Sequence, residues 1–215
     1  QGGNPLPEEL QNSTTYYLGL RWDVLPSVGN IIQTDSLAGK IIMEVVQSRN
    51  NPRPSFTNGG FETGDFTGWS VNYPWLANVM TSYTSDQGTV YNPKEGNKFA
   101  VLNAGAGTGV YTVVSQTVNL KAGQKLAGWA AFDAKDYLPF DDDSAVVIVS
   151  GGPLATPWSA KISDPDVGNY GETDWEHWTW TAPADGTYTL ELKVRNVGDN
   201  ILPSTALFDA NVIDP

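Results

Sequence analysis

Short strand-like stretches separated by turn residues run through this sequence from about residue 69 to its end. In the clearest stretch, residues 187–195, the apolar side chains of Tyr188, Leu190, Leu192 and Val194 alternate with polar ones. A period of two places one side of a strand in a core and the other side in water. No helical period extends beyond about two turns. The pattern therefore predicts an all-β protein built from antiparallel strands.

The predicted strands are separated by turn sequences such as Ala184-Asp-Gly and Gly198-Asp-Asn. Their expected ranges are residues 69–73, 78–84, 98–103, 111–119, 126–134, 144–149, 158–162, 177–181, 187–196 and 205–213. The 22 glycines and 14 prolines of the chain suit many short strands joined by tight turns. These features favour a sandwich of two sheets.

Two motifs bracket this strand series: residues 57–69 read TNGGFETGDFTGW and residues 206–213 read ALFDANVI. Together they resemble the opening and closing of the galactose-binding-like β-jelly rolls of secreted bacterial and archaeal proteins. These include many carbohydrate-binding modules and also adhesive and matrix proteins. The resemblance implies a two-sheet antiparallel jelly roll over residues 55–215, with its first and last strands adjacent. It leaves residues 1–54 as a separate segment.

The segment 1–54 contains two strand candidates, residues 14–25 and 40–47, but too little apolar surface for a domain of its own. Residues 40–47 are apolar on both faces apart from Glu44, so both faces need cover. The segment resembles the donor strands of extracellular filament and tube subunits, and we expect an extended β-arm that pairs with a neighbouring copy. The expected subunit contacts are Ile41, Ile42, Met43, Val45, Val46, Tyr17, Leu18, Leu20 and Trp22.

Composition excludes several classes of function. The chain has no cysteine, which excludes disulfides, thiolate metal sites and cysteine nucleophiles. Its net charge is −12, and residues 55–215 hold nineteen of the 24 acidic and eight of the 12 basic side chains, so nucleic acid is not an expected partner. No apolar stretch approaches the ~18–20 residues of a membrane span. The start at Gln1 rather than Met leads us to expect a secreted protein, extracellular or at the cell surface.

Five aspartates fall within a short loop between two apolar strands. They are Asp133, Asp136, Asp141, Asp142 and Asp143. Calcium takes six to eight oxygen ligands from carboxylates and carbonyls, and a proline-containing loop can supply both. The spacing is not that of an EF-hand. A calcium site and an acidic, solvated loop both fit the pattern.

A second calcium site is implied by the jelly-roll resemblance, at the point where the first strand meets the last. The matching residues are Glu62, Asn97 and Asp209. Asp209 lies within an apolar strand, and a buried carboxylate needs a cation or several hydrogen bonds. The alternative is that Asp209 accepts backbone N–H groups from the turn at Asn58. Calcium is thus the expected cofactor, by either site.

Catalysis is not expected. Asp133 with Asp136, or Glu172 with Asp174 and Glu176, would supply paired carboxylates, but neither set comes with a recognisable cleft. His177 is the single histidine, and no Gly-x-Ser-x-Gly motif is present. The sequence therefore predicts a non-enzymatic protein.

Aromatic side chains offer a further binding resource. Trp75, Trp158, Tyr170 and Trp175 lie in or beside predicted loops, where an exposed ring can stack on a sugar. Packing in the core or against another subunit is the alternative for each. Two functions follow: a self-assembling homopolymer that forms a filament, tube or surface layer by strand exchange, which we favour from sequence, or a polysaccharide-binding module.

Overall fold

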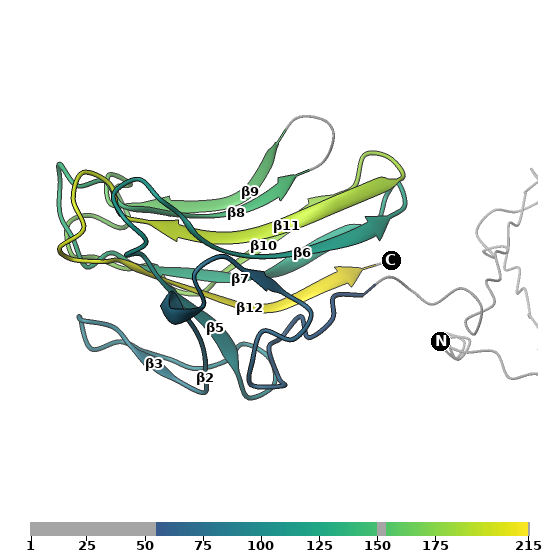
Figure 1. The fold of residues 1–215 in the computed structure, drawn as a ribbon, viewed down its shortest axis with the longest axis horizontal. Coiled ribbons are helices and arrows are strands. Elements are labelled where there is room, and N and C mark those ends of the chain that lie inside the picture. The colour runs from purple at the N-terminus through teal and green to yellow at the C-terminus, as the bar shows by residue number, and fades with distance from the viewer. Residues whose placement is uncertain (1–54, 150–153, 215) are drawn as a thin grey trace, which may run out of the picture. The chain divides into compact units, whose positions relative to one another are not determined.

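The computed structural model describes residues 55–149 and 154–214, and there the chain is a sandwich of two antiparallel sheets (Figure 1). Sheet A has five strands in the order β1-β6-β11-β8-β9, and sheet B has five in the order β10-β7-β12-β5-β2. Strands β3 and β4 form a separate two-stranded sheet. The predicted all-β jelly-roll sandwich is confirmed.

The elements are the strands β1 (Ser70–Val71), β2 (Ala77–Met80), β3 (Tyr83–Thr84), β4 (Val90–Tyr91), β5 (Phe99–Asn103), β6 (Thr112–Leu120), β7 (Lys125–Asp133), β8 (Asp143–Val149), β9 (Ala155–Lys161), β10 (Glu176–Thr181), β11 (Gly186–Arg195) and β12 (Thr205–Asp214), and the 3-10 turn η2 (Pro74–Leu76). Every predicted strand has a counterpart, but the one expected at 78–84 is divided into β2 and β3. The two-residue strand β4 was not predicted. No helix within the described residues has the length and apolar character to cross a membrane.

The main core lies between the two sheets. On β11 the predicted alternation holds, with Leu190, Leu192 and Val194 fully buried and Glu191 and Lys193 on the outer face. Fully burying such a side chain stabilises the fold by about 1.5–3 kcal/mol. The repeated alternation thus fixes which face of β11 points inward, and leaves its outer face polar.

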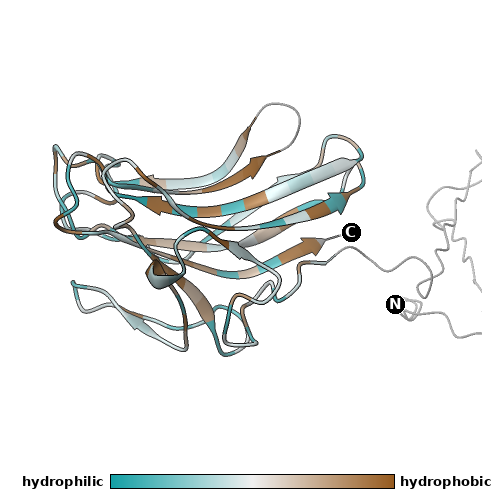
Figure 2. Cartoon of the chain, viewed as in Figure 1, coloured by the Kyte–Doolittle hydropathy of each residue, from teal (hydrophilic) through white to brown (hydrophobic). Residues whose placement is uncertain are grey.

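Sheet B is covered on its outer face as well, and β5 shows why. Its residues Ala100 and Leu102 enter the main core, while Phe99 and Val101 belong to a second buried cluster on the other side. Figure 2 shows β5 as apolar (brown), as expected of a strand buried on both faces. Tyr91 of the β3–β4 hairpin completes this second cluster. The hairpin is therefore packed against the outer face of sheet B.

The opening motif lies against the last strand, as the resemblance implied, but as a turn. The backbone and side-chain N–H groups of Asn211 both donate to the carbonyl oxygen of Gly59, at 3.1 and 2.9 Å. A Cβ atom at Gly59 would lie 2.0 Å from the Asn211 carbonyl oxygen, so the contact requires glycine. The first strand, β1, pairs with β6 rather than β12. The expected adjacency of first and last strands is therefore wrong, since a loop makes the contact.

The predicted arm, residues 1–54, lies outside the described residues. This includes all of its expected subunit contacts: Tyr17, Leu18, Leu20, Trp22, Ile41, Ile42, Met43, Val45 and Val46. Strand exchange through the arm stays a prediction.

Candidate functional site

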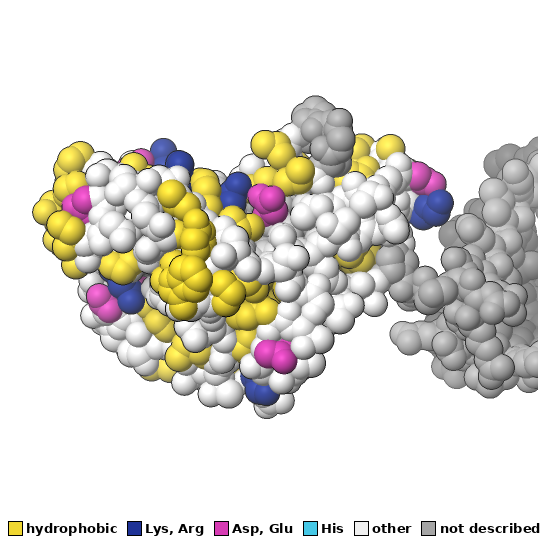
Figure 3. Space-filling model, viewed as in Figure 1, with side chains coloured by type: hydrophobic (Ala, Val, Ile, Leu, Met, Phe, Trp, Pro, Cys, Tyr) yellow, Lys and Arg dark blue, Asp and Glu magenta, His cyan; other side chains and the backbone are white. Residues whose placement is uncertain are grey.

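Four long loops meet at one end of the sandwich, drawn at the left of Figure 1, and we call this region the loop end. They comprise residues 104–111, 134–142, 162–175 and 196–204, joined there by η2 and the tip of the β3–β4 hairpin. Figure 3 shows hydrophobic side chains gathered at this end and over η2. The exposed large hydrophobic residues there are Trp75, Val110, Tyr137, Leu138, Tyr170, Ile201 and Leu202. Exposed apolar side chains that gather in one region mark interaction sites.

Three aromatic rings from two loops form one group. Tyr137 lies 5.3 Å from Tyr170 and 5.5 Å from Phe140, centroid to centroid. The loops that carry them are tied together, because the backbone N–H of Tyr170 donates to the Asp136 carbonyl at 2.8 Å. The Gln87 amide of the hairpin tip donates to the Tyr170 carbonyl at 2.6 Å. Tyr170, 45% exposed, is thus held in place by contacts from two directions.

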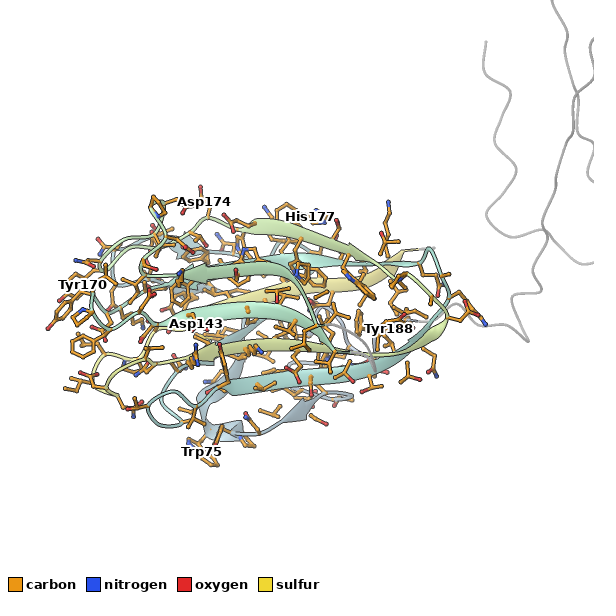
Figure 4. The ribbon with its side chains drawn as sticks, turned by 90° about the horizontal axis from the view of Figure 1, so that it is seen from above. Trp75, Asp143, Tyr170, Asp174, His177 and Tyr188 are labelled. Atoms are coloured by element: carbon orange, nitrogen blue, oxygen red, sulfur yellow. The ribbon has the colours of Figure 1, made fainter. Side chains whose placement is uncertain are left out.

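Trp75 presents a second aromatic surface. It lies on η2 with 73% of its surface exposed, and Tyr73 packs against it edge-on at 5.5 Å. Pro74 starts the turn, where its fixed φ is compatible with a helical conformation. Figure 4 shows Trp75 and Tyr170 on different sides of the loop end. The exposed aromatics therefore form two groups and not one row.

A cavity of about 430 Å³ opens at the loop end, next to η2 and the hairpin tip. Its wall includes Leu76, the neighbour of Trp75, and Asp86, the neighbour of Gln87. The polar part of the wall includes an ion pair, with Lys135 Nζ 3.7 Å from Asp86 Oδ1. The remaining lining residues are Asn103, Ala104, Gly105, Leu202 and Pro203. The loop end thus combines exposed rings with a cavity of mixed polar and apolar character.

The outer face of sheet A holds a smaller hollow of about 280 Å³. Its one aromatic side chain is Tyr111, whose ring carries the Lys193 ammonium at 4.7 Å and the Arg195 guanidinium at 4.6 Å. The Tyr111 hydroxyl donates to Asp143 at 2.5 Å, and Arg195 Nε donates to the same carboxylate at 2.7 Å. Because cations already cover this ring, the face offers less for stacking than the loop end does.

The sequence-predicted sugar-binding residues divide into two pairs. Trp75 and Tyr170 are exposed, as expected. The prediction that Trp158 is exposed is wrong. Trp158 is only 7% exposed within the main core, and its Nε1 donates to Glu176. Trp175 packs against the second cluster and donates through Nε1 to the Asn92 carbonyl at 3.0 Å, so its ring is an anchor for the hairpin.

Sequence reasoning missed Tyr137 and Phe140. Both lie inside the segment that was read as an aspartate loop, where the carboxylates attracted attention and the interspersed rings did not. The available signal was the pair of aromatic residues at 137 and 140, set in a polar stretch between two apolar strands.

The five clustered aspartates separate in the structure. Asp142 is fully buried and accepts from the Val197 backbone N–H at 2.7 Å and from the Ser204 hydroxyl at 2.8 Å. Asp141 accepts from the backbone and hydroxyl of Ser163, at 2.7 and 2.9 Å. Asp143 accepts from Tyr111 and Arg195, as described above. Asp136 accepts from the Tyr137 backbone N–H at 2.8 Å. Asp133 accepts from the hydroxyl of Tyr83 in the hairpin. They tie different segments together. Within residues 55–149 and 154–214 no three acidic or histidine side chains converge on a point suited to a metal.

The second predicted calcium set is brought together. Glu62 Oε1 accepts the backbone N–H groups of Asn97 and Lys98, both at 2.9 Å. Asp209 accepts the N–H groups of Lys94 at 2.6 Å, Glu95 at 3.1 Å and Ala210 at 2.6 Å. Its backbone donors thus come from residues 94–95 and its own strand, not from the Asn58 turn. Calcium binding here stays a prediction.

Both fully buried carboxylates have displaced pKa values. Burial raises the pKa of Asp142 to about 6, although the N–H of Val197 and the hydroxyl of Ser204 oppose the shift. Burial likewise raises the pKa of Asp209 to about 6, against the opposing backbone hydrogen bonds from Glu95, Lys94 and Ala210. Desolvation outweighs the hydrogen bonds in both cases.

No protein-family model matches the chain, and no curated protein matches it. Among solved structures it resembles TmCBM61 in complex with β-1,4-galactotriose, with a TM-score of 0.48, 19% identity, and 73% of this chain and 94% of that chain covered. It also resembles the K3 adhesin domain of Lys-gingipain from Porphyromonas gingivalis W83 (TM-score 0.43, 14% identity, 75% and 99% covered). A third is the CBM22-1 xylan-binding domain of Xyn10C from Paenibacillus barcinonensis (TM-score 0.40, 14% identity, 74% and 91% covered). Because all three TM-scores are below 0.5, the resemblance does not assign the chain to a family.

Proposed function

We propose that this chain is a non-enzymatic polysaccharide-binding module that acts outside the cell and binds its ligand at the loop end. The observation that carries the proposal is the pairing of exposed, positioned rings with a cavity. Trp75 adjoins the cavity-lining residue Leu76 in the sequence, and the Tyr170 carbonyl accepts from Gln87, the neighbour of the lining residue Asp86. The loop end is also where most of the exposed large hydrophobic side chains gather.

The chemistry of the loop end suits a sugar ring. One face of a pyranose is apolar and packs against an aromatic ring, while its hydroxyls need hydrogen-bond partners. The cavity supplies such partners through Asp86, Asn103 and Lys135. Its volume of about 430 Å³ lies within the range typical of small-molecule sites, ~300–1,000 Å³. The long axis of a polysaccharide could then extend from the cavity over either aromatic group.

The charge of the chain favours a neutral polysaccharide. Residues 55–215 hold nineteen acidic and eight basic side chains, and several of the acidic ones, among them Asp86 and Asp199, belong to the loop end. An anionic chain such as a polyuronate would be repelled at low ionic strength. We therefore expect neutral glucans, galactans, mannans or xylans to bind better than polyuronates.

Affinity electrophoresis and calorimetry with a panel of these soluble polysaccharides test the proposal. Trp75→Ala and Tyr170→Ala should each weaken binding by roughly tenfold or more, because a central aromatic contact is worth at least about 1–2 kcal/mol. Val90→Ala is the matched control, since Val90 is 57% exposed on β4 outside the loop end. Binding that survives both aromatic substitutions, or no binding to any polysaccharide, would refute the proposal.

A second candidate, the self-assembling homopolymer, is favoured by one observation on sheet A. Strand β1 pairs only with Val114 and Ser115 of β6. Beyond them the Gln116 side chain exchanges hydrogen bonds with the Thr57 backbone, at 2.7 and 2.9 Å. Among the described residues no strand pairs with this edge over residues 117–120. An edge of this kind can accept a strand from another copy.

A further inference from the structure

Two carboxylates face each other beneath the loop end. Asp133, the last residue of β7, forms an isolated antiparallel bridge with Glu172 of the 162–175 loop. Backbone bonds fix this pairing on both sides: Ala134 N–H donates to the Gly171 carbonyl and Thr173 N–H donates to the Phe132 carbonyl, each at 2.9 Å. Directly opposed residues of an antiparallel pair carry their side chains on the same face, with Cβ atoms ~4.5–5.5 Å apart.

Each of these carboxylates has a buried oxygen with no hydrogen-bond partner among the described residues. They are Oδ1 of Asp133 and Oε2 of Glu172. Asp133 is only 1% exposed, and its other oxygen, Oδ2, accepts from the Tyr83 hydroxyl at 2.5 Å. A buried, unpaired carboxylate oxygen is costly unless a ligand or proton satisfies it. Two such oxygens on adjacent carboxylates point to a shared ligand.

The nearby cation of the protein, Lys135, does not supply a partner for these two carboxylate oxygens. Lys135 Nζ lies 3.9 Å from Asp133 on the Oδ2 side, and it also pairs with Asp86 at 3.7 Å. Its single charge is therefore divided between two carboxylates, while Glu172 remains unbalanced. Burial also raises the pKa of Asp133, and the charges of Asp86 and Glu172 add to that rise.

We propose that a calcium ion binds between Asp133 Oδ1 and Glu172 Oε2. Calcium prefers carboxylate oxygens and accepts main-chain carbonyls and water for the rest of its six to eight ligands, without the strict octahedron that magnesium demands. Its two positive charges would balance the pair. The ion would fasten the 162–175 loop to the end of β7 and, through Tyr83, to the β3–β4 hairpin. This site is separate from the Glu62, Asn97 and Asp209 set.

Terbium luminescence on the full chain tests the site. Terbium replaces calcium and emits when a nearby tyrosine is excited, and the Tyr83 hydroxyl donates to the carboxylate that would hold the ion. We expect wild-type protein freed of metal with EDTA to gain terbium emission, and calcium to reverse it. With two protein carboxylates the dissociation constant should fall at about 10⁻⁴–10⁻³ M, so titration should extend to about 10 mM.

Glu172→Gln should lower the terbium emission at least tenfold and abolish the rise in melting temperature that calcium produces through this site. It removes no hydrogen bond of Oε2, so its melting temperature in EDTA should match that of wild type. Asp133→Asn should have the same effect on emission. Asp209→Asn is the control and should leave the Tyr83-sensitised emission intact. Unchanged emission in both Glu172→Gln and Asp133→Asn, or no terbium uptake by wild type, would overturn the proposal.

Discussion

At the scale of single residues, the buried carboxylates Asp142 and Asp209 link stability to pH. Both have a pKa raised to about 6 from an ordinary value of 3.8. The folded state therefore binds protons more tightly than the unfolded state over this window. Their contribution to stability is fully present below about pH 4 and is lost as pH rises through about 6.

Asp209→Asn isolates one of these contributions. The melting temperatures of the variant and of wild type should be compared in EDTA from pH 4 to pH 7. As pH rises, the free energy of unfolding of the variant should increase relative to that of wild type, and its melting temperature with it. The increase should reach up to about 2–3 kcal/mol, since two pKa units are worth roughly that much. A difference between the two proteins that does not change with pH would show that Asp209 does not titrate in this window.

Gly59 gives a steric prediction. Gly59→Ala should destabilise the protein by about 2 kcal/mol or more, because the new methyl would lie 2.0 Å from the Asn211 carbonyl and push the opening turn off the last strand. Gly60→Ala is the matched control, since the nearest atom to its Cβ is 3.8 Å away. Urea denaturation measures both. Equal stability of the two variants would mean that the turn does not pack against β12 as described.

At the scale of elements, the β3–β4 hairpin shows how so small a unit holds its place. Two strands of two residues each are too short to be stable alone. The hairpin is anchored through apolar contacts of Tyr91 and through two tyrosine hydroxyls, of which Tyr91 donates to the Thr173 carbonyl at 2.6 Å. These anchors hold the hairpin tip, with Asp86, at the cavity.

Tyr91→Phe should therefore cost about 1–2 kcal/mol of unfolding free energy, because it leaves a buried carbonyl without that donor. Tyr73→Phe is the control, since the Tyr73 hydroxyl makes no hydrogen bond to the described residues, and it should change stability by less than about 0.5 kcal/mol. Hydrogen exchange at residues 83–91 should rise in Tyr91→Phe alone. Equal exchange in both variants would remove the hydroxyl anchor from the account.

At the scale of the whole molecule, the strand series and the sandwich could be predicted from the sequence, because a period of two along each strand reports burial directly. Strands such as β11 needed no other information. The hairpin could not be predicted, since its strands of two residues have no period. The pairing of the first strand was missed because the opening motif contacts β12 through a turn stabilised by Gly59.

The candidate site was only partly predictable, because contacts between segments distant in the sequence decide which of its side chains are exposed. Trp75 and Tyr170 lie in loops and are exposed, but Trp158 has a similar local sequence context and is buried by the opposite sheet. The aspartates at 133–143 are close in sequence, yet their partners are distant: Asp142 bonds Val197, 55 residues away. Local composition cannot report such contacts, which arise only when the loops meet at one end.

The arm is a prediction at this scale too. If residues 40–47 of one copy pair with the free edge of another, deletion of residues 1–50 should give a monomer in size-exclusion chromatography and electron microscopy, whereas the full chain should form open polymers. Polymers of the truncated protein, or a strictly monomeric full chain, would rule out strand exchange through the arm.

The central claim, that the loop end binds a neutral polysaccharide, is tested most directly by following the indole N–H signals of the eight tryptophans by NMR during titration with an oligosaccharide of the polysaccharide that binds. The account predicts that the Trp75 signal, assigned with Trp75→Phe, and the backbone amides of Tyr137, Leu138, Phe140 and Tyr170 shift in proportion to ligand bound. The signals of the buried Trp158 and Trp178 should stay in place. Shifts confined to the outer face of sheet A, around Tyr111 and Lys193, with Trp75 unaffected, would contradict it.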